Sequence, residues 1–101
     1  MSKYILKDGE PVLATDIIHW ATWFEKASTN KERTVAKDKI GEAVVSTVFL
    51  GIDHSWDGGP PVLWETMIFG GKHDDYQERY SSLKDAEAGH KVAVNLVKGD
   101  K

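Results

Sequence analysis

The apolar run from Ala43 to Ile52 limits the possible folds of this chain more than any other segment. It is rich in valine and contains Phe49, and both residue types are typical of β-strands. The alternate positions on both of its faces are largely apolar, which predicts a central strand covered on both sides. At 101 residues the chain suits one domain, 1–101, so this strand is expected to lie in a single core.

Shorter segments on either side of this run also predict strands. Tyr4–Leu6 and Val12–Ala14 flank Asp8-Gly9, a pair that supplies the positive φ angles of a tight hairpin turn. Lys37–Gly41 is interpreted as the connection that precedes the central strand. The other predicted strands are Arg33–Ala36, Val62–Phe69 and an edge strand Tyr76–Tyr80, and the glycine- and proline-rich segment Asp53–Pro61 predicts an irregular loop.

Two segments show the periodicity of amphipathic helices. The first follows a possible cap at Thr15 or Asp16, and one apolar stripe contains Ile17, Trp20, Ala21 and Phe24. The second runs from Leu83 to about Lys98, after a capping box formed by Ser82 and Asp85. The expected fold is therefore α+β, a small and mostly antiparallel sheet of about four or five strands with two helices packed on one face.

The second face of this sheet is not covered by the helices in that arrangement. In the strand 62–69 the two alternating sets of side chains both contain large apolar groups, so an apolar surface remains whichever set meets the helices. The sets are Leu63, Glu65, Met67, Phe69 and Val62, Trp64, Thr66, Ile68. Uncovered apolar surface in a small domain usually contacts another chain. We therefore expect a homodimer or higher oligomer.

Composition excludes several classes of function. The chain has no cysteine, which rules out disulfides, zinc–thiolate sites and thiol catalysis. No apolar run approaches the ~20 residues that span a bilayer, and the N-terminus turns polar after Leu6, so neither a membrane segment nor a signal peptide is expected and the location is expected to be cytoplasmic. The net charge is −3, and the only basic cluster is diluted by Glu32 and Asp38, so nucleic-acid binding is not expected. That cluster, interpreted as a solvated hairpin, contains Lys31, Arg33, Lys37 and Lys39.

The segment after the central strand is the most suggestive place for a functional site. Asp53 and His54 lie where the buried strand ends, and strand ends and loops are where sites are usually built. Asp53 could orient the His54 ring for general-base chemistry, with Glu65 nearby on the next strand, although the chain has no phosphate-binding glycine loop, HExxH or GxSxG motif. In the alternative interpretation, Asp53 has a structural role only and accepts hydrogen bonds from the amides of the loop. Both interpretations stay open.

Binding residues are expected in the same region. The candidates are Trp56, Asp53, His54, Asp57 and Trp64, and Trp56 is the one tryptophan in a loop, where an aromatic side chain can anchor a partner. His73-Asp74-Asp75 carries metal-ligand types, but adjacent ligands in a turn rarely close a site, so no metal and no cofactor is expected. His90 lies on the apolar stripe of the second helix and is interpreted as a buried, hydrogen-bonded core residue beside Gly89, which would let another element approach closely.

Several segments together resemble a family of short, uncharacterised proteins encoded by tailed bacteriophages and prophages. The central pattern consists of Ser46–His54, Gly58–Pro61 and Leu63–Gly71, read as STVFLGIDH, GGPP and LWETMIFGG. The resemblance also covers the first helix, with Asp16 and Trp20–Glu25, and the tail, with Arg79–Ser82 and Asp85–His90. It implies a phage gene product that works inside an infected bacterium, and it implies no activity and no catalytic residues.

Three hypotheses about function follow. The leading one is a non-enzymatic accessory protein that binds a host protein or sequesters a small ligand, in the manner of host-directed phage proteins that block a bacterial defence system. The alternative is a small hydrolase or nucleotide-binding enzyme that uses Asp53, His54 and Glu65. A component of the virion or of its assembly is the third.

Overall fold

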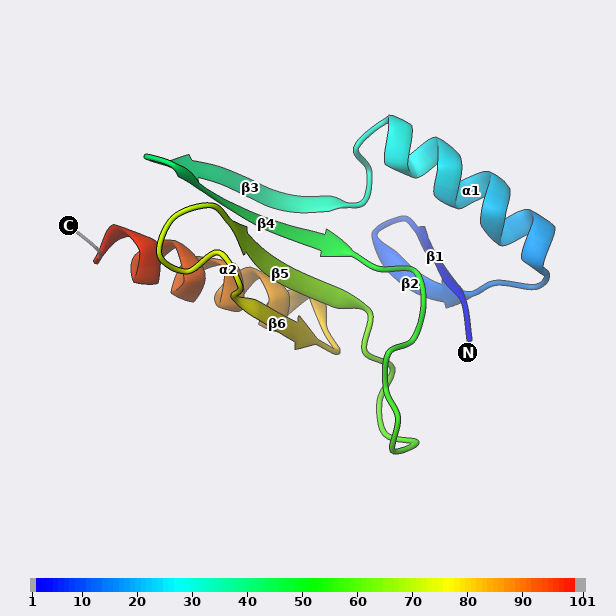
Figure 1. The fold of residues 1–101 in the computed structure, drawn as a ribbon. Coiled ribbons are helices and arrows are strands. Elements are labelled where there is room, and N and C mark those ends of the chain that lie inside the picture. The colour runs from blue at the N-terminus through cyan, green and yellow to red at the C-terminus, as the bar shows by residue number, and fades with distance from the viewer. Residues whose placement is uncertain (1, 100–101) are drawn as a thin grey trace.

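Six strands and two helices form an α+β fold in the computed structural model, which describes residues 2–99 (Figure 1). The predicted fold class is confirmed. The elements, in chain order, are β1 (Tyr4–Lys7), β2 (Glu10–Leu13), α1 (Ile17–Thr29), β3 (Thr34–Ile40), β4 (Ala43–Phe49), β5 (Trp64–Phe69), β6 (Gln77–Tyr80) and α2 (Leu83–Lys98). The strands form two sheets, where a single sheet of about four or five strands was expected.

The larger sheet is an antiparallel meander in the order β3-β4-β5-β6, and the smaller one is the hairpin of β1 and β2. The predicted turn of that hairpin is confirmed, because Asp8 and Gly9 have φ angles of 52° and 81°. Strand β4 lies between β3 and β5, and it pairs with β5 from Val44↔Phe69 to Phe49↔Trp64. The predicted interior position of this strand in the sheet is therefore correct.

Helix α2 packs across the four-stranded sheet and buries one face of it (Figure 1). Every second residue of β4 is buried under this helix, and the intervening residues are only half-buried. Ala86, His90 and Ala93 form the buried side of α2, with Ser82 as its predicted cap. The buried side chains on this face of the sheet are Ala43, Val45, Thr47 and Phe49 from β4, and Trp64, Thr66 and Ile68 from β5.

The predicted packing of both helices on one sheet face is wrong for α1. This helix lies at the end of the sheet beside the β1–β2 hairpin, and its backbone lies closest to β1 (Figure 1). Trp20 fixes it there, because its Nε1 donates hydrogen bonds to the carbonyls of Tyr4, at 3.1 Å, and Gly51, at 3.0 Å. Trp23 reaches the core edge-on to Phe49, with 5.9 Å between the ring centroids.

Two further expectations about the sheet are corrected. Most of the segment Lys37–Gly41 is strand and not connection, because β3 continues to Ile40 and a tight turn at Gly41 leads into β4. The central strand is covered on one side only: within residues 2–99, no helix or second sheet packs on the face opposite α2. The structure also shows no helix, in the part that it describes, that is long and apolar enough to cross a membrane.

Candidate functional site

The loop between β4 and β5 projects away from the end of the sheet (Figure 1). Asp53 holds its base together, because its Oδ1 accepts hydrogen bonds from the backbone N–H of Ser55, at 2.8 Å, and of Val62, at 2.9 Å. The backbone N–H of His54 also donates to the carbonyl of Val62, at 3.0 Å. These bonds join the two ends of the loop, so the segment beyond them starts from a fixed base.

Trp56 lies in the outer part of this loop and is 95% exposed. Asp57, beside it, accepts a hydrogen bond from the backbone N–H of Gly59 at 3.0 Å, which makes a local turn beyond the tryptophan. Trp56 therefore does not pack on the edge of the core. An indole that contacts almost none of its own chain is available to contact something else.

The electrostatics of the loop follow from its backbone. The amides of Ser55 and Val62 stabilise the charged form of the Asp53 carboxyl and hold its pKa below the ordinary value. His54 adds a weaker effect in the same direction. The Asp53 carboxylate is thus committed to loop amides, which is the simpler of the two roles expected from the sequence.

Trp64 and Glu65 are the first two residues of β5, and their partners lie outside the loop. The Glu65 carboxylate accepts hydrogen bonds from Arg79 Nε, at 2.9 Å, and from Gln77 Nε2, at 2.5 Å, both on β6. Trp64 is 3% exposed and packs edge-on against Phe49. The structure therefore places Trp64 in the core, while the other binding candidates share the loop.

A chain of hydrogen bonds beneath α2 contains groups that the sequence did not connect. His90 Nε2 lies 2.7 Å from Asp38 Oδ2 on β3, and His90 Nδ1 lies 2.7 Å from Thr47 Oγ1 on β4. Thr47 Oγ1 lies 2.5 Å from Thr66 Oγ1 on β5. The prediction that His90 is a buried, hydrogen-bonded core residue is confirmed.

This chain has the order of a carboxylate–imidazole–hydroxyl triad, but its hydroxyl end is closed. Thr47 and Thr66 are both 0% exposed, and a nucleophile needs space for the carbonyl or phosphoryl group that it attacks. Only Asp38 reaches the surface, with 55% of its side chain exposed. The arrangement satisfies buried polar groups that would otherwise be costly, and it links α2 to three strands.

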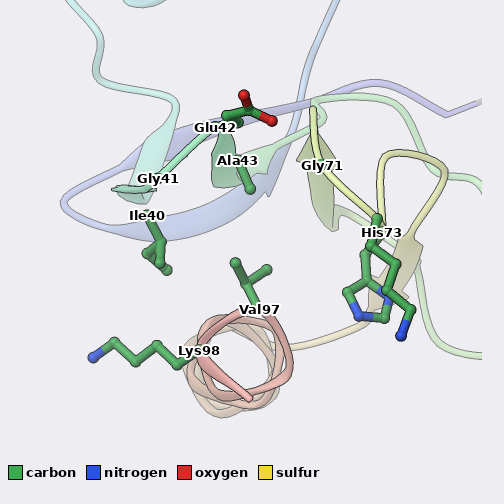
Figure 2. A pocket seen from close by; sticks show the side chains of 9 residues that line it. Ile40, Gly41, Glu42, Ala43, Gly71, His73, Val97 and Lys98 are labelled. Carbon is green, nitrogen blue, oxygen red and sulfur yellow. The ribbon is translucent and has the colours of Figure 1, made fainter. Parts of the chain in front are cut away.

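A groove of about 600 Å³ opens at the opposite end of the sheet from the Trp56 loop (Figure 2). It lies between the β3–β4 turn, the segment after β5 and the end of α2. Ile40, Ala43 and Val97 point into it, whereas the charged ends of Glu42 and Lys98 extend away from its centre. Its surface is mostly apolar, and Lys72 and His73 also line it.

The segment 73–75 was predicted to be a turn and not a metal site. Asp74 Oδ1 accepts a hydrogen bond from the backbone N–H of Gly70 at 2.5 Å, which closes a turn after β5. Residues 2–99 contain no group of three or more histidine, aspartate or glutamate side chains placed to hold a metal ion.

Searches of protein-family models, of curated proteins and of solved structures find no match to this chain.

Proposed function

We propose that this protein is a non-enzymatic binding protein of a bacteriophage, and that it engages a host protein in the bacterial cytoplasm through the loop 53–61. The observation that carries the proposal is the position of Trp56, which is 95% exposed on a projecting loop. A tryptophan buries roughly 150–250 Å² when it is covered, so leaving it in water is unfavourable unless a partner covers it.

The base of the loop supports a role in binding. Asp53 joins Ser55 to Val62, so part of the ordering of this segment is complete before any partner arrives. A preordered loop loses less conformational entropy on association, which favours tighter binding for the same contact area. Hot spots of interfaces are enriched in tryptophan for the same reasons of area and rigidity.

The contacts of the catalytic candidates favour binding over the alternative of a small hydrolase. The Asp53 carboxylate accepts from the amides of its own loop, and the Glu65 carboxylate accepts from β6. Each carboxylate therefore serves a structural role.

The origin in a phage rests on the resemblance of the segments Ser46–His54 and Leu63–Gly71 to phage and prophage proteins. Such a protein would act on a host component, with a bacterial defence system as one class of target. We also propose that the protein is a homodimer.

Capture from a lysate of the host bacterium tests the binding role of the loop. We expect the immobilised wild-type protein to retain a host protein that Trp56→Ala loses, because the variant removes the anchor and leaves the core untouched. Val92→Ala is the matched control, since Val92 is another apolar side chain, 61% exposed on α2. Equal capture by all three proteins would contradict the proposal, and so would the absence of any retained protein.

A further inference from the structure

The face of the four-stranded sheet opposite α2 forms a second surface, which we call the open face. Its members follow from register, because residues paired across neighbouring strands point to the same side. They alternate along β4 with the buried residues Val45 and Thr47. Across the sheet, the three rows of the open face are Lys39, Val44, Phe69; Lys37, Ser46, Met67, Gln77; and Thr34, Val48, Glu65, Arg79.

The centre of the open face is apolar. Val44 and Val48 on β4 and Met67 on β5 are half-buried by their neighbours in the sheet, and Phe69 is 49% exposed. The residues behind them are completely buried under α2, so the two sides of the same strands differ sharply in coverage. Contiguous apolar side chains on a solvent-facing sheet mark a surface that associates.

The edges of the open face carry positive charge. Lys37 and Lys39 are exposed along β3, and Arg79 lies on the opposite edge strand, β6. The single carboxylate of the face, Glu65, is 7% exposed and is already bonded to Arg79. A chain of net charge −3 thus presents a face on which cations outnumber carboxylates.

We propose that the open face binds an acidic protein segment that has an apolar centre. This proposal goes beyond the proposed function, because it assigns a partner of stated chemistry to a surface other than the loop 53–61. Apolar residues of the partner lie over Val44, Val48 and Met67, and its carboxylates meet the lysines at the edge of β3. Charge of this kind accelerates association and selects the partner, while the apolar centre supplies most of the affinity.

A second copy of this chain is a poorer occupant of the open face. Two copies placed face to face would bring Lys37, Lys39 and Arg79 together with the same residues, and like charges across an interface are unfavourable. Nucleic acid is also disfavoured, because single strands stack on several aromatic rings of a sheet and this face has only Phe69.

A synthetic peptide tests the proposal. Four strands about 4.8 Å apart span about 14 Å, which about four to six extended residues bridge. The probe is a fluorescent peptide with an apolar middle of about this length between runs of glutamate, and its anisotropy is measured at low salt. We expect Lys37→Glu/Lys39→Glu to lower the affinity for the peptide by at least about tenfold. Phe69→Ala is expected to lower this affinity as well.

The control is Lys84→Glu/Lys91→Glu, which makes the same change of net charge on the exposed surface of α2. Equal weakening by both double variants overturns the proposal, because net charge alone would then explain the binding. Tighter binding of oligodeoxythymidylate, lost in Lys37→Glu/Lys39→Glu, would assign the face to nucleic acid. If the wild type is a dimer that dissociates only in Lys37→Glu/Lys39→Glu or in Phe69→Ala, the open face binds a second copy.

The peptide also separates this proposal from the role of the loop. Trp56→Ala is expected to bind the peptide within about twofold of the wild type, since Trp56 is outside the open face. Loss of host capture in Trp56→Ala with peptide binding intact supports both surfaces. Absence of peptide binding in the wild type, with capture still dependent on Trp56, rejects the open face alone.

Discussion

His90 uses both ring nitrogens inside the protein, one on Asp38 and one on Thr47. Its ring is 5% exposed, so each of these bonds replaces contacts with water that the unfolded chain would make. Thr47 is the critical member, because its single hydroxyl oxygen also contacts Thr66. Removing that hydroxyl would take a hydrogen-bond partner from Thr66 on β5 and from His90 on α2.

Thr47→Val is expected to lower the free energy of unfolding by about 1–3 kcal/mol, although the side-chain volume barely changes. Urea denaturation measures the difference. Thr34→Val is the control, because Thr34 is exposed on the open face, and a change within about 0.5 kcal/mol is expected there. Equal effects of the two substitutions would show that the hydrogen-bond chain does not stabilise the fold.

Sequence reasoning reached part of this network. The helical periodicity placed His90 on the apolar side of α2 and so predicted its burial. Asp38 was counted among the charges of a solvated hairpin, because its partner is 52 residues away in the chain. Alternation along β3 separates Asp38 from Lys37 and Lys39, and this follows only once the segment is known to be a strand.

The contact between α2 and β6 depends on a glycine. Gly89 lies on the helix where Tyr80 of β6 packs, and a Cβ at this position would overlap the tyrosine ring and hydroxyl. The sequence predicted a close approach at Gly89 but could not name Tyr80. Burial in this contact also raises the pKa of the Tyr80 hydroxyl above its ordinary value.

Gly89→Ala is expected to destabilise the protein by about 1–3 kcal/mol, even though alanine favours a helix by about 1 kcal/mol. Thermal and urea unfolding measure the effect. The matched experiment places the same substitution in a Tyr80→Val background, where the smaller side chain removes the overlap and the loss should largely disappear. A Gly89→Ala protein that is more stable than the wild type would contradict the close packing.

Elements were predicted better than their contacts. Both helix starts agree with their caps, Asp16 and Ser82, because capping depends on residues close in the chain. The position of α1 depends on Trp20 bonding to Gly51, a distant contact that periodicity does not encode. For the candidate site, the sequence marked the loop, but not which of its residues is exposed.

On the scale of the molecule, the proposed homodimer needs a surface other than the positively charged open face. Leu13, Ile17 and Ile18 are 57%, 57% and 75% exposed where β2 leads into α1. Lys3 and Asp16 line the same hollow as Leu13 and Ile17. A two-fold axis places the same patch on both copies, so the lysine of one copy can meet the aspartate of the other.

Light scattering at micromolar concentration should therefore give the mass of a dimer for the wild type. We expect Ile17→Glu to be monomeric, because a charge would enter the apolar centre of the contact. Phe69→Glu, a change of the same kind on the open face, is expected to remain dimeric. A monomeric wild type would reject the homodimer. A dimeric Ile17→Glu with a monomeric Phe69→Glu would show that the two copies meet through the open face instead.

The environments of the four tryptophans have a practical consequence. Trp64 is enclosed by the core and Trp20 and Trp23 are half-buried, while Trp56 is surrounded by solvent. A solvated indole emits at longer wavelengths than an enclosed one, so the long-wavelength part of the intrinsic fluorescence comes from the loop. The protein thus carries its own optical reporter, and covering Trp56 would shift the emission toward the blue without any attached label.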